Sequence, residues 1–211
     1  LNGNIDSTMF FSINCSISLG CTDSLACNYD SLSTINNNSC RYPAIAPYYE
    51  SFSSGFLPQG DSCNWLQSAI IGDGWRFNGL PGYAAAYNGR DTGSYAWIDF
   101  SSTDVGVVMQ LDPVDVSTQG VPTLTFDYFS DIGLTYTMTS YNILHVEAYN
   151  GSSWDSVVSY QELNAGWVTK VIDVSSFAVS GVVSLRLRGE SGNDVNDYYN
   201  DLLVDNICVA D

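Results

Sequence analysis

The sequence predicts an all-β protein: an antiparallel β-sandwich of the jelly-roll kind, preceded by a small disulfide-rich module. Short runs of β-type residues follow one another from residue 48 onward, and Gly, Asn, Asp and Ser separate them at regular intervals. No stretch keeps a convincing helical period. Six cysteines are present, and four of them lie within the first forty residues. About ten strands without helices favour a sandwich, and the crowded cysteines favour a stapled module before it.

The chain changes texture near residue 46. Residues 1–46 are rich in Ser, Asn and Cys, whereas residues 47–211 alternate β-type runs with turn residues. Between them, PAIAP at 43–47 predicts a stiff joint, because each proline fixes its own φ and restricts the residue before it. We therefore expect a Cys-rich module over 1–46 and a sandwich domain over 47–211. The apolar run at 9–13 is a strand either of this module or of a domain upstream.

The strands of the larger domain are predicted from β-type runs and from alternation. Apolar and polar residues alternate most clearly at 123–129 and 183–188, so each of these strands has one face in the core and one in water. Asn150-Gly151 predicts a tight hairpin turn. The expected strands span 48–52, 64–67, 75–78, 95–100, 105–111, 122–130, 143–149, 156–163, 167–173, 182–188 and 202–209.

The charge of the chain excludes several classes of partner. The sequence has 23 Asp and Glu against 6 Lys and Arg, a formal net charge of −17. Nucleic acids and anionic membrane surfaces both require a basic face, so neither is expected as a partner. No apolar run approaches the roughly 20 residues of a membrane span, so no membrane insertion is expected. The excess of acid favours multivalent cations as ligands, or simply solubility.

The cysteines indicate an oxidising compartment. An even number of them, Cys15, Cys21, Cys27, Cys40, Cys63 and Cys208, predicts disulfides, although the first four can pair in three ways. A zinc site formed by the first four is the alternative, but no CxxC pair is present. Cys63 and Cys208 flank the first and last strands of the sandwich, which lie together in a jelly roll, so we predict that they are bonded. Since the chain starts without Met or a signal segment, we expect it to be a piece of a longer secreted or cell-surface protein with neighbouring domains.

The Cys-rich segment combines GCTDSLACNYD at 20–30 with NNNSC at 36–40. It resembles short Cys/Asp repeats of the form CTDxxACNYD…DGSC found in large secreted proteins of marine Bacteroidetes. The resemblance implies a calcium ion, for which Asp23, Asn28 and Asp30 would supply hard oxygen ligands. This copy has three asparagines where the repeat has Asp-Asp-Gly, which weakens cation binding. A disulfide-stapled spacer with Asx turns and no ion is the alternative.

The larger domain contains DTGSYAWIDFS at 91–101, YESF at 49–52 and LVDNICV at 203–209. These segments are similar to MAM domains, particularly the MAM-like modules of secreted bacterial proteases and adhesins, and the likeness covers nearly all of 48–211. It implies a jelly roll and a structural calcium ion near the join of the first and last strands.

Carried over position by position, the calcium ligands implied by the MAM likeness are Glu50, Asp91 and Asp205, together with loop carbonyls. Three converging carboxylates repel one another unless a cation joins them. The alternative is that Glu50 and Asp205 only cap exposed strand ends. The family commonly has Asp-His-Thr where this chain has Asp91-Thr92, so a role for that histidine is not expected here.

No enzyme is expected within this chain. The only histidine, His145, lies in a strand pattern, and no P-loop, HExxH or GxSxG motif is present. With so many acids, a carboxylate pair for glycoside hydrolysis carries no specificity. The acids Glu190, Asp194, Asp197 and Asp201 either surround a second ion or form a solvated loop, and the solvated loop is the commoner case.

Aromatic residues in loops are the candidates for ligand binding. Trp75, Trp97 and Trp167 lie in predicted strands and are assigned to the core. Tyr83, Tyr87 and Arg90 lie in a loop, and Trp154 follows the Asn-Gly turn; such rings can stack on sugar faces.

The expected function is that of a non-catalytic extracellular recognition or adhesion module, stabilised by calcium and disulfides. Its partner would be an extracellular protein or a glycan. Two alternatives remain open: a carbohydrate-binding module that assists an enzyme elsewhere in the parent chain, and a passive structural spacer.

Overall fold

A computed structural model describes residues 17–59, 63, 65–79, 81–88, 94–132 and 137–211, without the side chains of Tyr83, Tyr87 and Asn88. The chain divides into two compact units, residues 1–41 and 42–211. The boundary lies earlier than position 46 because strand β3 (Ala44–Ile45) pairs with β8 (Val114–Asp115) of the larger unit. The proline-flanked segment therefore belongs to the sandwich rather than forming a free joint.

The smaller unit is built from turns around two short parallel strands, β1 (Leu19–Gly20) and β2 (Ile35–Asn36). A disulfide joins Cys21 to Cys40, and Cys27 is also disulfide-bonded. These bonds confirm the predicted disulfide framework over the zinc alternative. Cys15 and the apolar run at 9–13 lie outside the described residues.

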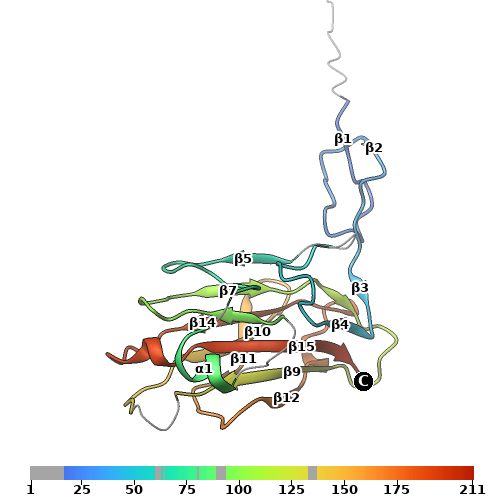
Figure 1. Ribbon diagram of the computed structural model, residues 1–211. Coiled ribbons are helices and arrows are strands. Elements are labelled where there is room, and N and C mark those ends of the chain that lie inside the picture. Colours follow the sequence, from blue (N-terminus) through green and yellow to red (C-terminus); the bar gives the residue numbers. More distant parts are fainter. Residues whose placement is uncertain (1–16, 60–62, 64, 80, 89–93, 133–136) are drawn as a thin grey trace, which may run out of the picture. The chain divides into compact units, whose positions relative to one another are not determined.

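The larger unit is an antiparallel β-sandwich, which confirms the predicted fold class (Figure 1). One sheet has five strands in the order β11 (Trp154–Tyr160), β10 (Ile143–Tyr149), β14 (Leu185–Glu190), β7 (Val107–Gln110) and β5 (Leu66–Ser68). The second has the order β12 (Val168–Asp173), β9 (Thr123–Ser130), β15 (Leu202–Ala210) and β4 (Tyr48–Glu50), with β6 (Ala96–Ile98) also paired to β15. A small third sheet joins β13 (Val182–Val183), β8 and β3.

Alternation along the strands builds the core between the two large sheets. In β9, Leu124, Phe126 and Tyr128 are fully buried in this core, while the residues between them are partly exposed. The strands β10 and β14 show the same alternation. Burying side chains from both inner faces is the main apolar stabilisation of the sandwich.

A second, smaller apolar cluster covers the outer face of the sheet that contains β15. Ala85, Tyr95, Trp97, Phe129 and Leu203 are buried in it, and Trp167 packs against it. Ala85 belongs to helix α1 (Tyr83–Asn88), a segment that was predicted to be a loop. The run of three alanines favours a helical turn, but it is too short to show a helical period in the sequence. Two short 3₁₀ helices, Ser175–Phe177 and Asp197–Tyr199, complete the regular structure.

The predicted Cys63–Cys208 disulfide is wrong. Cys63 is disulfide-bonded, whereas Cys208 is a free thiol. The first and last strands of the sandwich, β4 and β15, do pair as expected. However, Cys63 precedes β5 of the other sheet, and Cys208 lies between two core residues of β15, so its side chain points to the outer face.

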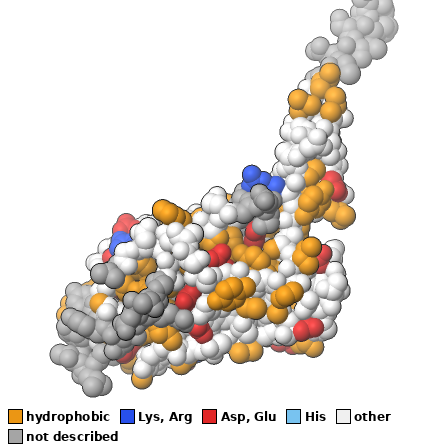
Figure 2. All heavy atoms as spheres, turned by 45° about the vertical axis from the view of Figure 1, so that its right-hand side comes forward, with side chains coloured by type: hydrophobic (Ala, Val, Ile, Leu, Met, Phe, Trp, Pro, Cys, Tyr) orange, Lys and Arg blue, Asp and Glu red, His pale blue; other side chains and the backbone are white. Residues whose placement is uncertain are grey.

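The acidic surface is spread out rather than concentrated. On the face shown in Figure 2, Asp and Glu side chains lie singly over the larger unit, with Lys and Arg in few places. Among the described residues, no helix is long and apolar enough to cross a bilayer.

Candidate functional site

The outer face of the sheet that contains β10 and β14 carries a group of aromatic and charged side chains. Along β10 and β14 every second side chain enters the core, so the side chains between them emerge on the outer face. Strand pairing sets Glu147 opposite Arg186 and Tyr149 opposite Trp154. Because directly opposite side chains share a face, residues from β11, β10 and β14 meet there.

Glu147 lies at the centre of this group and binds two arginines. Its Oε2 accepts a hydrogen bond from Arg186 Nε at 2.5 Å, and its Oε1 accepts one from Arg188 Nε at 2.9 Å. The Glu147 side chain is only 8% exposed, against 23% for Arg186 and 21% for Arg188. Arg188 also pairs with Glu190. Hydrogen bonds between ionised groups are strong, so this network restrains both guanidinium groups on the outer face of the sheet.

Trp154 is held in place by the same network. The Arg186 guanidinium lies over the indole ring, with Cζ 4.5 Å from the ring centroid. The rings of Tyr149 and Trp154 pack together with their centroids 5.6 Å apart. The indole of Trp154 is half-buried, so part of it remains accessible to a ligand. We call Tyr149, Trp154, Glu147, Arg186, Arg188 and Glu190 the β10–β14 face.

His145 lies at one side of this face. Its Nδ1 is 2.6 Å from the Ser159 hydroxyl of the neighbouring strand β11. Burial, and then the positive charge of Arg188, lower the pKa of the imidazole, which is therefore neutral at pH 7.

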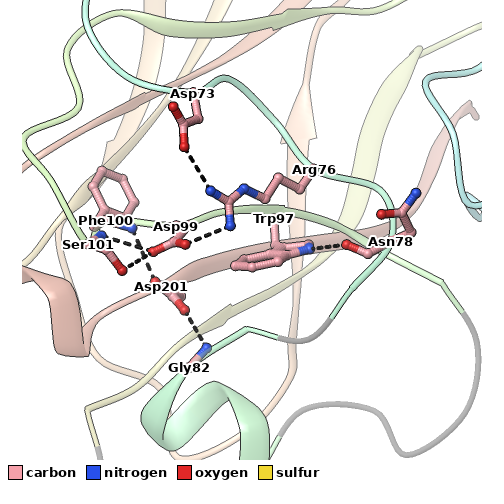
Figure 3. A network of polar contacts seen from close by, with 9 residues as sticks. All are labelled: Asp73, Arg76, Asn78, Gly82, Trp97, Asp99, Phe100, Ser101 and Asp201. Atoms are coloured by element: carbon pink, nitrogen blue, oxygen red, sulfur yellow. Dashed lines mark hydrogen bonds and ion pairs between the residues drawn. The ribbon is translucent and has the colours of Figure 1, made fainter.

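A second polar network holds the loop before α1, the segment predicted to bind a ligand (Figure 3). Arg76 pairs with Asp99 at 2.6 Å and with Asp73 at 2.9 Å. Asp201 accepts hydrogen bonds from the backbone N–H groups of Gly82 at 2.9 Å and Phe100 at 3.2 Å. Asp201 thus ties the start of α1 to the chain after β6, which indicates a structural role.

Two aspartates near Arg76 are buried. Asp201 is 2% exposed, and burial raises its pKa to about 7 even though its two backbone hydrogen bonds lower it. Asp104 is 1% exposed, and burial raises its pKa to about 6. Its Oδ2 has no hydrogen-bond partner among the described residues.

The predicted ligand residues do not converge. Trp154 lies on the outer face of the sheet that contains β10. Helix α1 carries Tyr83 and Tyr87, and it packs through Ala85 on the outer face of the other sheet, which contains β15. Nothing is described of the tyrosine side chains, and Arg90 lies outside the described residues. Trp75 and Trp97 are buried, which confirms their assignment to the core, whereas Trp167 is only partly buried and packs against the smaller apolar cluster.

The predicted calcium ligands of the sandwich lie on different faces of one sheet. Glu50 lies opposite Ile207, whose side chain is in the core, so Glu50 is on the inner face. Asp205 lies opposite Asp127, and Asp127 is between the core residues Phe126 and Tyr128 of β9, so Asp205 is on the outer face. Glu50 accepts a hydrogen bond from the backbone of Phe52, and Asp205 Oδ1 accepts one from Asn206 at 2.7 Å. Asp91 lies outside the described residues, so calcium binding here stays a prediction.

In the smaller unit, the predicted calcium ligands are engaged in turns. Asp23 accepts a hydrogen bond from Leu25 N–H, and Asp30 accepts two, from Leu32 N–H and the Ser33 hydroxyl. Asn28 donates to Ser39 O and accepts from Arg41 N–H. Asp23 and Asp30 thus form Asx turns, while Asn28 joins the two ends of the Cys-rich segment, and calcium binding by these three residues stays a prediction. Across both units, the described residues contain no group of three or more His, Cys, Asp or Glu that could hold a metal.

The acidic loop before β15 divides among separate partners. Asp194 accepts hydrogen bonds from Thr139, which lower its pKa to about 2. Asp197 accepts one from Ser191, Glu190 pairs with Arg188, and Asp201 is buried. The four carboxylates therefore do not surround a common point.

Sequence reasoning missed Glu147 and its two arginines. The alternation at 183–188 does place Arg186 and Arg188 on a wet face. Their pairing with Glu147 depends on β10 lying beside β14, two strands that are far apart in the sequence. No local sequence pattern predicts that β10 and β14 are neighbours in the sheet.

Comparison with known proteins adds little. No family model matches the chain and no curated protein matches it, so the MAM and repeat resemblances stay predictions. Solved structures that resemble it are β-sandwich carbohydrate-binding modules. TmCBM61 in complex with beta-1,4-galactotriose is 11% identical with a TM-score of 0.47, covering 75% of this chain and 92% of that one. The CBM22-2 xylan-binding domain of Paenibacillus barcinonensis Xyn10C is 14% identical with a TM-score of 0.43, covering 77% and 98%. A family 6 carbohydrate-binding module is 10% identical with a TM-score of 0.41, covering 80% and 96%. These values are too low to transfer a ligand to this chain.

Proposed function

We propose that the larger unit is a non-catalytic carbohydrate-recognition module, and that the β10–β14 face is its binding surface. The carrying observation is Trp154, whose half-buried ring is fixed by Arg186 and Tyr149. A rigid ring offers an apolar platform for the C–H face of a sugar at low entropic cost. The guanidinium groups beside it supply hydrogen-bond donors for hydroxyl oxygens.

The chemistry around His145 supports a non-catalytic role. Its contact with the Ser159 hydroxyl is the nearest approach to a nucleophile–base pair among the described residues. Arg188 beside the imidazole disfavours the imidazolium that acyl transfer would form, and the lowered pKa weakens the histidine as a base. The disulfides suit a secreted or surface protein, so the partner would be an extracellular glycan.

Protein adhesion is a second candidate, favoured by a separate observation. The edge strand β5 and the chain after it expose Leu66 by 57%, Ile70 by 79% and Ile71 by 54%. Exposed apolar residues at a sheet edge are a common place for contact with another protein.

Calcium remains part of the proposal. If the turns of the smaller unit hold an ion, or if Glu50 or Asp205 holds one on its own face of the sheet with loop carbonyls, calcium chloride raises the melting temperature above its value in EDTA at equal ionic strength. An unchanged melting temperature would remove calcium from the account.

The proposed function is tested with neutral polysaccharides. Retention in gels containing xylan, galactan, mannan or β-glucan identifies a ligand, and calorimetry with its oligosaccharide gives the Kd. Trp154→Ala is expected to weaken binding at least about tenfold, the loss of one stacking contact. Tyr49→Ala is the matched control, because Tyr49 is an exposed ring on β4 of the other sheet, and it should bind like the unaltered protein. Absence of retention on every polysaccharide, or equal binding by Trp154→Ala, would contradict the proposal.

A further inference from the structure

The charged groups of the β10–β14 face cancel one another. Arg186 and Arg188 carry two positive charges, and Glu147 and Glu190 carry two negative charges in direct contact with them. His145 faces Arg188 and adds no charge at pH 7. Arginine on a binding surface usually recognises a carboxylate or phosphate through a bidentate pair. Here both arginines are already paired with carboxylates of the protein itself, Glu147 and Glu190.

The position of Glu147 determines what the arginines can still offer. The carboxylate contacts Nε of both side chains. Arg188 Nη1 is also engaged, with Glu190. The Nη groups of Arg186 and Nη2 of Arg188 are the donors left for a ligand, while the charge behind them is neutralised at close range. Donors without a net positive charge fit the hydroxyl oxygens of an uncharged sugar better than a uronate or sulfate.

The rest of the molecule acts in the same direction. The chain has a formal net charge of −17, and few basic groups are available to attract an anion. The negative charge of the molecule would repel an acidic glycan, and the β10–β14 face has no uncompensated positive charge to attract it.

We propose that Glu147 is a specificity-determining residue, which makes the β10–β14 face selective for uncharged glycans over acidic ones. This inference rests on the proposed carbohydrate-binding function. It predicts that unaltered protein binds a neutral oligosaccharide at least about tenfold more tightly than an acidic oligosaccharide of similar length.

The test compares the neutral oligosaccharide found by gel retention with trigalacturonate, by calorimetry at fixed pH and low salt. Glu147→Gln keeps the shape of the side chain and leaves the face with one uncompensated positive charge. This variant is expected to bind trigalacturonate about tenfold more tightly than the unaltered protein, as one charge-assisted contact allows, and salt should weaken the gain. The double variant Glu147→Gln/Arg188→Gln restores neutrality and should lose the gain.

Glu162→Gln is the matched control, because it changes the net charge equally at the separate Lys170–Glu162 pair. It should leave the ratio of the two affinities unchanged. Equal binding of both oligosaccharides by unaltered protein, an unchanged ratio in folded Glu147→Gln, or the same gain in Glu162→Gln would overturn the inference. Even if Glu147→Gln fails to fold, equal binding of the two oligosaccharides by unaltered protein still overturns the inference. If Trp154→Ala still weakens binding in these cases, the proposed function survives; if no sugar of either class binds, it fails as well.

Discussion

Single residues of this protein show how burial decides the role of an acid. Glu147 is buried but contacts two arginines. Asp201 is also buried, but its hydrogen bonds come from backbone N–H groups, and the neighbouring cation Arg76 is paired with Asp73 and Asp99 instead. Desolvation therefore dominates at Asp201 and raises its pKa to about 7. From the sequence, Glu147 is only an acid in a β-type run and Asp201 an acid in a loop. Their burial could not be predicted, because it depends on neighbours from distant strands.

The raised pKa of Asp201 predicts a pH dependence of stability. Its pKa in the folded state lies above the unfolded value, so the folded state binds the proton more tightly. The resulting stabilisation is fully present below about pH 4 and is lost as the pH rises through about 7. We expect the free energy of unfolding to fall between pH 5 and pH 8 by on the order of 2 kcal/mol from this group.

Urea unfolding of Asp201→Asn at the two pH values measures this contribution, and the variant should lose most of the fall. Asp104, whose pKa is about 6, keeps a smaller slope in place. Asp173→Asn is the control, because hydrogen bonds to Ser175 lower the pKa of Asp173 and confine its effect to acid solution. The same slope in Asp201→Asn and in unaltered protein would show that Asp201 is ionised in the folded state.

At the scale of elements, strands were predictable and their partners were not. The expected strands at 122–130 and 143–149 match β9 and β10 almost to the residue, because β-type runs and period-two burial are local properties of the chain. The expected strand at 182–188 is divided into β13 and β14, and β14 extends to Glu190. The expected strand at 75–78 is reduced to a bridge between Arg76 and Trp97. The two-residue strands β3 and β8 exist only because β8 pairs with β3 on one side and with β13 on the other, and no local pattern could reveal them.

The loops at one end of the sandwich are joined by a buried asparagine. Asn142 is fully buried; its Nδ2 donates to Asp197 O and Asn200 O, and its Oδ1 accepts from Gly192 N–H, all at 2.8 Å. Asn142→Ala should destabilise the protein by about 3 kcal/mol in urea unfolding, because three buried hydrogen bonds are lost.

Asn150→Ala is the matched control for this element. The Asn150 side chain makes five hydrogen bonds within its hairpin, more than that of Asn142, but it is exposed, so water replaces them and the cost should be about 1 kcal/mol or less. Equal costs at the two positions would mean that Asn142 does not join the loops as described.

At the scale of the whole molecule, the charge of −17 is spread over the surface, while the β10–β14 face is internally neutral. The scarcity of Lys and Arg argues against nucleic acid as a partner, and the predicted loops suggest their aromatic residues as ligand residues. The sequence could not show that Trp154 and α1 lie on different sheets, because that depends on strand order. The candidate site was therefore predictable for one aromatic residue and not for its charged surroundings.

The most direct test of the central claim is a ¹⁵N NMR titration of the unaltered protein with the neutral oligosaccharide identified by gel retention. The account predicts that the side-chain Nε–H signals of Trp154, Arg186 and Arg188 shift together with increasing ligand. Shifts confined to residues 81–88 or to the β5 edge, with the Trp154 signal unchanged, would contradict it.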